Sequence, residues 1–513
     1  MQKNSFLFII LSLFTVLSWY FLASPYYHRQ LPQRVAKTQN GVTVSGDSAR
    51  NVKNVAKYVE ENINIETGKY KAILTNKGAA ILSWSVKEKN GQIVDLVAPD
   101  SVPVMANFPN EIYKIVSKSD KKVVFEHVSR DGWRITKTYN FSDLYMHNLS
   151  VSIEKISGVT FPEIVFKWGP GLCFGSNAKE IEENISLTKI SAYNAAVPNK
   201  IEKLKNVSKS AALYKWTAID NRYFLAAFIP ANFSDFDKII SSRLDKKHPY
   251  SLTFTALIPE DINKKNYSID FYLGPKIYRY LKTYNLGLEK TVDFGFFGFL
   301  GKAAFAILVF FHKITNNYGW AIVALTVGIQ ILVLPLTLKS SKSAALMKNI
   351  QPIIKDIQTE YKNNPQRLQA EMLNIYKSQK INPLGGCLPI ILQIPIFWAF
   401  FTMLRNVYEL RNESWILWIK DLSAADHFMR IGSFNFNLLP LIMGVGMFFQ
   451  QRMTTAASDP MQKRMMYIVP IVFIFMFWSF PSGLVIYWIT NSVISTIEQY
   501  FIMKGNAIRV KRV

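Results

Sequence analysis

Residues 316–338, NNYGWAIVALTVGIQILVLPLTL, decide the architecture of this 513-residue chain. The stretch carries no charge, and about 20 apolar residues at about 1.5 Å each cover the roughly 30 Å hydrocarbon core of a bilayer. It therefore predicts a transmembrane helix. Gln330 lies near its middle, with Thr326 one helical turn earlier on the same face. Because a polar group at that depth needs a partner, Gln330 either hydrogen-bonds a neighbouring helix or lines a hydrated cavity.

The composition also favours a membrane protein. Hydrophobic residues make up 49% of the chain, while 60 lysines and arginines outnumber 36 acids. The basic excess has two explanations, the positive-inside rule and attraction to RNA or anionic lipid. The two cysteines, Cys173 and Cys387, fall in segments predicted to lie in different environments, so no disulfide is expected between them. The histidines lack metal-ligand spacing.

The N-terminal residues suit either a secretory signal peptide or a retained membrane anchor, since residues 5–23 are almost wholly apolar. No small-x-small cleavage site follows, and Pro25 directly after Ser24 disfavours cleavage there. We therefore expect a transmembrane anchor at residues 1–24, followed by a polar linker at residues 25–54.

Residues 55–285 show short β-rich runs separated by turn signals, which predicts an all-β domain. Asn90-Gly91 and Asp131-Gly132 each separate two such runs. Both dipeptides suit tight hairpins, because positive φ costs little for Asn, Asp and Gly. An antiparallel β-sandwich is expected.

Residues 286–315 contain a second apolar run, interrupted by Lys302, which suits either a span or a helix lying at the membrane surface. If it spanned, the basic segment after Leu338 would face outward, against the positive-inside rule. We therefore expect an interfacial amphipathic helix.

Five spans are expected within residues 316–503, with a helical hairpin at 339–381 between the first two. Apolar residues of the hairpin recur at three- and four-residue steps, and Asn363-Asn364-Pro365 separates its arms. The later spans are expected at residues 384–404, 434–449, 467–480 and 484–502.

With the N-terminus inside, six spans place three basic segments in the cytoplasm: residues 339–381, 452–464 and a tail at 504–513. The β domain and residues 405–433 then lie on the opposite side. The short loops match the positive-inside rule, so the basic excess of these segments needs no nucleic acid to explain it.

Several longer motifs follow one another along the chain. They are NPLGGCLP at 382–389, QIPIF at 393–397, ELR at 409–411, LWIKDLS at 417–423, DPMQ at 459–462, FPSGL at 480–484 and, in the β region, WTAIDNRYFLAAFIP at 216–230 and FYLGPK at 271–276. These motifs closely resemble the YidC family of membrane insertases. The resemblance implies a polytopic α-helical membrane protein of six transmembrane helices, with a five-helix insertase core and an inserted all-β periplasmic supersandwich domain of the sugar-mutarotase type.

The resemblance also implies a function. Proteins of this family move nascent membrane proteins from the cytoplasm into the bilayer through a hydrophilic groove, alone or with the Sec translocon, without nucleotide hydrolysis. Implied partners are nascent membrane proteins, the Sec translocon, the lipid bilayer, and the ribosome through the basic loops and tail. The implied location is the bacterial inner membrane, with both termini in the cytoplasm. Neither an enzyme activity nor a cofactor or metal is implied.

Polar and aromatic residues of the spans are candidates for substrate contact in this groove: Thr326, Gln330, Gln393, Tyr487, Trp488 and Asn491. The family has a groove arginine where this chain has Gln330, so a cation attracting acidic tails is not expected at that position. Tyr487-Trp488 stands where family members often have two tyrosines. That pair suits substrate contact or an aromatic core pair.

Two other functions compete with insertion. A small-solute transporter predicts repeated spans and paired intramembrane charges, and the sequence shows neither. A membrane-anchored carbohydrate enzyme predicts a carboxylate and a histidine in one cleft, for which Glu126, His127 and His147 are the nearest candidates.

Overall fold

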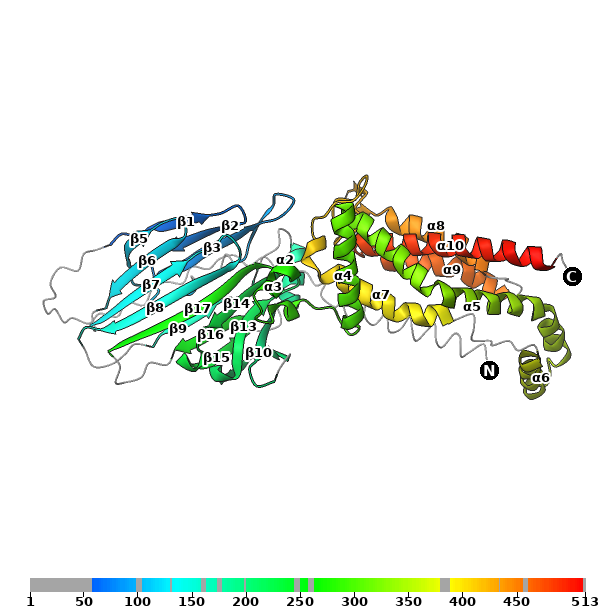
Figure 1. Ribbon diagram of the computed structural model, residues 1–513, viewed down its shortest axis with the longest axis horizontal. Coiled ribbons are helices and arrows are strands. Elements are labelled where there is room, and N and C mark those ends of the chain that lie inside the picture. The colour runs from blue at the N-terminus through cyan, green and yellow to red at the C-terminus, as the bar shows by residue number, and fades with distance from the viewer. Residues whose placement is uncertain are drawn as a thin grey trace. The chain divides into compact units, whose positions relative to one another are not determined.

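An all-β region is followed by a region of long helices in the computed structural model of the protein (Figure 1). Residues Tyr58–Val513 form one compact unit. The predicted anchor, the predicted linker and motif residues 382–387 lie outside the described residues. The structure describes residues 58–97, 104–129, 132–157, 163–172, 178–197, 200–243, 250–256, 263–378, 388–432, 434–454 and 460–510.

Three antiparallel sheets build the β region, as the sequence predicted. One four-stranded sheet consists of β1 (Asn62–Glu66), β2 (Tyr70–Thr75), β3 (Ala80–Lys87) and β4 (Ile93–Asp95). The nine-stranded sheet has the order β11 (Ile201–Leu204), β10 (Lys189–Asn194), β13 (Tyr214–Asp220), β14 (Phe224–Pro230), β17 (Lys264–Pro275), β8 (Met146–Lys155), β7 (Trp133–Asn140), β6 (Lys122–Val128) and β5 (Lys114–Lys118). The third sheet has the order β12 (Val207–Ser210), β15 (Phe236–Ser242), β16 (Ser251–Ala256) and β9 (Val165–Trp168).

Both predicted hairpins are confirmed. Strand β3 pairs with β4 and β6 pairs with β7, each in antiparallel register. Gly91 and Gly132 adopt φ of 82° and 83°, the left-handed conformation that glycine reaches without strain. Alternate residues of β7 are buried, so one face of this strand is covered by the core.

Large aromatic side chains fill the core of the β region. Trp84, Trp133 and Trp216 are completely buried, and side chains of this size dominate the stabilisation that burial provides. Lys137 is also buried, and its Nζ donates a hydrogen bond to the carbonyl oxygen of Met105 at 2.5 Å. Burial lowers the pKa of Lys137 well below its usual value, because the charged form loses its hydration.

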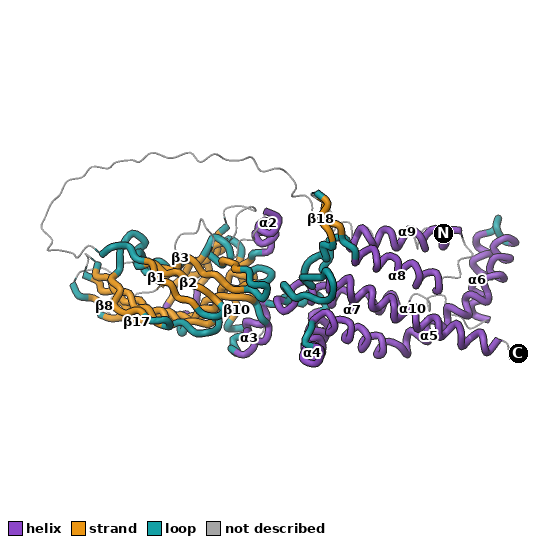
Figure 2. Tube along the Cα trace, turned by 90° about the horizontal axis from the view of Figure 1, so that it is seen from above, coloured by secondary structure: helices purple, strands orange, loops and turns teal. Residues whose placement is uncertain are grey.

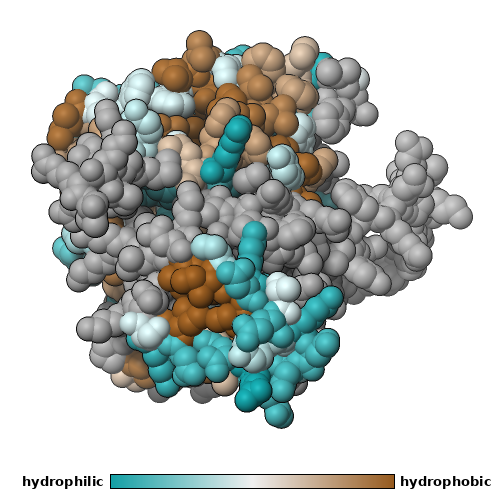
Figure 3. All heavy atoms as spheres, turned by 90° about the vertical axis from the view of Figure 1, so that its right-hand side faces the viewer, coloured by the Kyte–Doolittle hydropathy of each residue, from teal (hydrophilic) through white to brown (hydrophobic). Residues whose placement is uncertain are grey.

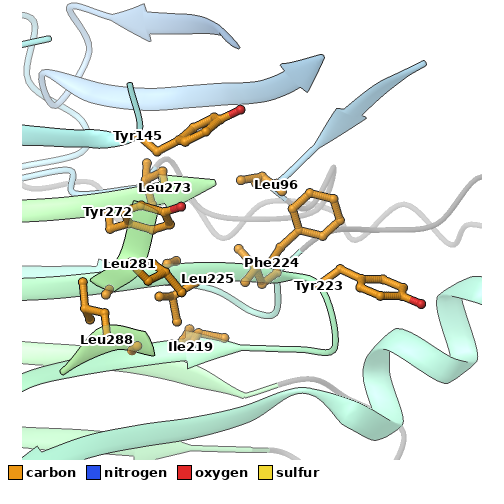
Figure 4. Close-up of a cluster of buried hydrophobic side chains, with 14 of the residues drawn as sticks. Leu96, Tyr145, Ile219, Tyr223, Phe224, Leu225, Tyr272, Leu273, Leu281 and Leu288 are labelled. Carbon is orange, nitrogen blue, oxygen red and sulfur yellow. The ribbon is translucent and has the colours of Figure 1, made fainter. Parts of the chain in front are cut away.

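A buried apolar cluster continues this core toward the helical region (Figure 4). Leu225 of β14 and Leu273 of β17 join Leu281 of α3 (Tyr278–Thr283) and Leu288 of the 3-10 helix η3 (Leu288–Thr291), and all four are fully buried. The segment that leads to the helices is therefore anchored on the end of the sheet.

Helix α4 (Gly298–Thr315) runs across the direction of helix α5 (Tyr318–Glu360), as Figures 1 and 2 both show. A sharp turn joins them. Asn316 adopts the left-handed conformation, with φ of 52°, and the Asn317 side chain accepts hydrogen bonds from the backbone N–H of Gly319 and Trp320.

Two helices among the described residues are long and apolar enough to cross a membrane: Gly298–Thr315 and Tyr318–Leu338, with mean hydropathies of 1.4 and 2.3. The second is the stretch that the sequence predicted to span. The first is the helix predicted to lie at the membrane surface, and its interfacial placement stays a prediction. The count of six spans stays a prediction.

The remaining helices run alongside α5 (Figures 1 and 2). They are α7 (Leu388–Asn406), α8 (Leu439–Thr454), α9 (Pro460–Phe477) and α10 (Ser482–Val510), and the shorter α6 (Pro365–Ser378) follows α5. Ile350 and Ile354 of α5 pack against Met372, Ile375 and Tyr376, so α5 and α6 form the predicted hairpin.

Several boundaries differ from those predicted. Helix α5 continues unbroken from the span into the first arm of the hairpin, although it contains Pro335 and Pro352. Helix α10 extends to Val510, so most of the predicted tail at 504–513 continues a helix. Helix α9 begins at Pro460 and includes part of the predicted basic loop at 452–464.

The span predicted at 434–449 begins later than expected, at Leu439. Residues 434–436 instead form strand β19 (Phe434–Phe436), which pairs with β18 (Met429–Ile431). The Asp426 carboxylate accepts hydrogen bonds from the backbone N–H of Leu438 and Leu439 at 2.8 and 3.1 Å. This carboxylate caps the helix and favours its start at that point.

Candidate functional site

Polar side chains meet between helices α5 and α10. Gln330 is 6% exposed, and its Nε2 donates a hydrogen bond to Oδ1 of Asn491. Gln330 thus has the neighbouring-helix partner that one of the two interpretations of this residue requires. Thr326, one turn earlier, is fully buried and donates to the carbonyl oxygen of Ile322 in its own helix at 2.7 Å.

A second polar pair lies seven residues further along each helix. The Thr337 hydroxyl donates to the carbonyl oxygen of Leu334 at 2.9 Å and lies near the carboxylate of Glu498. Gln330, Thr337, Asn491 and Glu498 together form what we call the polar seam. Since α5 and α10 run in the same direction (Figure 1), the two pairs are successive rungs about 10 Å apart along the helices.

Gln393 and Tyr487 form another polar contact next to the seam. The Gln393 Nε2 of α7 donates to Tyr487 Oη of α10. Tyr487 is buried, with its ring centroid 4.7 Å from that of Phe400. The structure therefore joins α7 to α10 through a hydrogen bond between two of the residues predicted to contact substrate.

Trp488 lies on a different side of α10 from Tyr487. Its ring centroid is 5.4 Å from those of Phe397, Phe473 and Phe477. Trp488 is partly buried in this cluster, so the aromatic-core interpretation describes its contacts in this structure.

Apolar packing closes the bundle at the starts of α5 and α10, beyond the seam. Ile322, Leu325 and Leu484 are at most 1% exposed. The backbone N–H of Gly483 donates to the carbonyl oxygen of Leu422 at 2.9 Å, and a Cβ on Gly483 would lie 3.1 Å from the Ile322 side chain. Polar contacts therefore occupy the part of the α5–α10 interface nearer the α5–α6 hairpin. The opposite part, around Ile322 and Leu484, is apolar and close-packed, and we call it the dry end.

The α5–α6 end of the molecule presents a mixed surface. Figure 3 shows hydrophilic residues surrounding an apolar patch on this side. Among hairpin side chains that the structure describes, Ile353 and Leu373 are 45% and 48% exposed. The hairpin thus offers both charged and apolar groups.

Charged residues lie at the other end of α7. Glu409, in the 3-10 helix η4 (Tyr408–Leu410), is 9% exposed, and its Oε1 accepts a hydrogen bond from the Tyr278 backbone at 2.9 Å. Burial raises the pKa of Glu409 to about 7. Arg411 follows, and its Nε lies 2.6 Å from Oε1 of Glu88, whose side chain is completely buried.

Sequence reasoning missed Glu498 and Thr337. The signal was present, because Glu498 is the single acidic residue of α10 and stands seven residues after Asn491. The pairing of Gln330 with Asn491 was not predicted either, although both residues were singled out by their polarity.

Comparison with known proteins identifies the family of the chain. The family described as 60Kd inner membrane protein matches residues 310–509, and that described as YidC periplasmic domain matches residues 94–307. The chain is 66% identical to the membrane protein insertase YidC of Endomicrobium trichonymphae over 525 aligned residues, which cover 100% of both chains. The chain belongs to the YidC family of membrane protein insertases.

The chain is also similar to more distant proteins. YidC of Syntrophus aciditrophicus is 32% identical to the chain, over 87% of this chain and 85% of that one. The crystal structure of an active YidC insertase with its first transmembrane domain resolved is 19% identical, covers 87% of this chain and 93% of that one, and has a TM-score of 0.40.

Membership in the YidC family confirms several predictions. The chain is an inner-membrane insertase and not an enzyme, its all-β region is the periplasmic domain of the family, and the two competing functions are excluded. The resemblance of that domain to sugar mutarotases stays a prediction.

The residues considered for a carbohydrate enzyme do not form a cluster. His127 of β6 aligns, through Ile135 of β7, with Ile153 of β8, six residues from His147. His147 is buried among aromatic rings, and burial lowers its pKa to about 3. Within the described part of the YidC-family chain, no three His, Cys, Asp or Glu side chains gather as metal ligands.

Proposed function

We propose that this insertase moves nascent membrane proteins from the cytoplasm into the inner membrane by opening the polar seam into a hydrated groove. The observation that carries the proposal is the hydrogen bond between Gln330 and Asn491. Two amide side chains meet at a membrane depth where burying apolar side chains would cost less free energy. Each amide is able to exchange its partner for water or for a peptide group of the substrate.

The energetics favour opening at the seam. Interhelical hydrogen bonds within membranes contribute about 0.6 kcal/mol on average, close to thermal energy. Separating Gln330 from Asn491 is therefore inexpensive when water or substrate takes the freed positions. The dry packing of Ile322 and Leu484, together with the Gly483–Leu422 hydrogen bond, offers no such exchange and keeps the opposite end closed.

A hydrated groove of this kind removes the main barrier to insertion. Each unsatisfied backbone group costs several kcal/mol in hydrocarbon, so a polar tail crosses more readily beside water and amide side chains. The apolar segment of the substrate then moves sideways into lipid. Gln393 and Tyr487 lie beside the same region, Trp488 borders it from the side of α7 and α9, and Thr326 marks the deep end of the groove.

The topology and the partners belong to the same proposal. With both termini in the cytoplasm, the α5–α6 hairpin, the basic residues at 452–464 and the end of α10 share the cytoplasmic side. These basic segments suit the ribosome, whose surface is rich in phosphate, while α4 lies at the opposite surface of the bilayer. The insertase acts alone or beside the Sec translocon.

Photocrosslinking from single sites to a stalled nascent membrane protein tests this function. Probes at positions 330 and 488 are expected to give substrate adducts. Two control positions give none: Val485, which is 1% exposed in the dry end, and Phe475, which is 74% exposed on the outside of α9. Absence of adducts at both 330 and 488, or equal adducts at all four positions, would refute a groove at this place.

A further inference from the structure

Glu498 is the one charged member of the polar seam. It is partly buried on α10, seven residues beyond Asn491 and beside the hydroxyl of Thr337. The other side chains that we place in the groove, from Thr326 to Trp488, carry no charge. Any recognition of charge within the described part of the seam therefore falls to this carboxylate.

The position of Glu498 along the helix is informative. It lies about 10 Å nearer the α5–α6 hairpin than the Gln330–Asn491 contact, since seven residues are two helical turns. On the proposed topology this is the cytoplasmic mouth of the seam. No lysine or arginine whose side chain the structure describes forms an ion pair with it. Burying a carboxylate in such a place costs free energy unless a cation pairs with it. An ionisable residue within a membrane helix bundle is therefore expected to have a functional role.

Substrates supply the matching cation. Transmembrane segments that stay oriented in the inner membrane carry lysine and arginine next to their cytoplasmic ends. A substrate span lying along the seam, with its tail already across, brings these flanking residues to the cytoplasmic mouth. An ammonium or guanidinium group there meets a carboxylate in partly desolvated surroundings, where the attraction is stronger than in water.

We infer that Glu498 binds the basic flank of the substrate span and so favours insertion in the orientation that keeps this flank in the cytoplasm. The inference rests on the proposed groove. Glu498 acts as a specificity residue: it stops the substrate at the depth where the basic flank reaches the carboxylate and leaves the apolar span beside the lipid. Gln330, which is deeper and neutral, accepts polar tails without selecting their charge.

The test uses the full-length insertase in liposomes and three versions of one single-span substrate, whose cytoplasmic flank carries two lysines, two glutamines or two glutamates. Glu498→Gln is expected to reduce insertion of the lysine version about three- to five-fold, the effect of a partly exposed ion pair, and to leave the glutamine version unchanged. Glu498→Lys is expected to favour the glutamate version. Glu360→Gln, which removes an exposed acid at the end of α5, is the matched control and changes no preference.

The outcomes separate the inference from the function on which it rests. An equal loss for all three substrates in Glu498→Gln, or an unchanged charge preference in both variants, would overturn the role of Glu498. Failure of the unaltered insertase to insert any of the three substrates would instead overturn the groove. A thiol crosslink from a cysteine at position 498 to a cysteine in the flank, absent when the cysteine is in the translocated tail, gives independent support.

Discussion

Replacing Gln330 by leucine separates the two roles of this residue. The change removes the hydrogen bond to Asn491 and keeps a side chain of comparable bulk, one bond shorter. Asn491 is only partly buried, so its amide is able to turn toward water. We therefore expect a loss of stability near the average of about 0.6 kcal/mol for such bonds, and not the roughly 1–3 kcal/mol of a buried group left without a partner.

The effect on insertion is expected to exceed the effect on stability. A polar tail loses one hydrogen-bonding site in the groove, worth about 1 kcal/mol, which corresponds to about a five-fold slower insertion. A substrate with a purely apolar tail makes no use of that site, so its rate stays within about two-fold. Gln330→Arg keeps hydrogen-bond donors toward Asn491 and water, and it is expected to be tolerated.

Protease protection of the two substrates in liposomes measures both rates. Leu332→Gln is the matched control, because position 332 is 80% exposed on the same helix, and this variant leaves the ratio of the two rates unchanged. An equal loss for both substrates in Gln330→Leu, or full activity on the polar tail, would return Gln330 to a purely structural role.

Three further predictions concern packing and charge. The pKa of Glu409 is raised from 4.5 to about 7, so this residue contributes stability that is complete below pH 4.5 and is lost as the pH rises through 7. Between pH 4.5 and 8 the unfolding free energy of the unaltered protein is therefore expected to decline by about 3 kcal/mol, and Glu409→Gln removes this decline. If the melting temperatures of both proteins change in parallel over this range, the prediction is contradicted. Gly319→Ala places a Cβ 2.1 Å from the ring of Trp415 and is expected to lower the unfolding free energy by about 1–3 kcal/mol, as measured by thermal unfolding. Gly328→Ala has open space around the added Cβ and is the neutral control. Equal melting temperatures for the two variants would show that Trp415 moves freely. Lys137→Met fills the same buried space without an amine, and it is expected to be neutral or to stabilise the β domain by up to about 2 kcal/mol at pH 7. A loss of stability above about 1 kcal/mol would show that the hydrogen bond to Met105 outweighs the cost of burying the amine.

Local chemistry made much of the fold predictable. The Asn90-Gly91 and Asp131-Gly132 hairpins follow from turn preferences, and the membrane span of α5 follows from an uncharged apolar run of sufficient length. The order of the nine-stranded sheet was not predictable in this way. Strand β17 pairs with β8, more than a hundred residues earlier, and no local pattern encodes such a partner.

The sequence singled out residues of the site by their type but did not predict the contacts between them. Polarity within apolar helices singled out Gln330 and Asn491, but the pairing depends on how two distant helices pack. The late start of α8 has a similar cause, because its capping residue Asp426 lies twelve residues before Leu438. Glu498 was overlooked although its charge alone was a signal, since it stands in a predicted span.

Linking the two sides of the seam tests most directly whether α5 and α10 separate during insertion. Cysteines at 330 and 491, joined by a short cleavable bifunctional thiol reagent with Cys173 and Cys387 replaced by serine, are expected to stop insertion of a polar-tailed substrate, and cleavage of the linker restores it. The same link between positions 322 and 483, in the dry end, is expected to leave insertion intact. Insertion at the normal rate with 330 and 491 linked would contradict an opening seam.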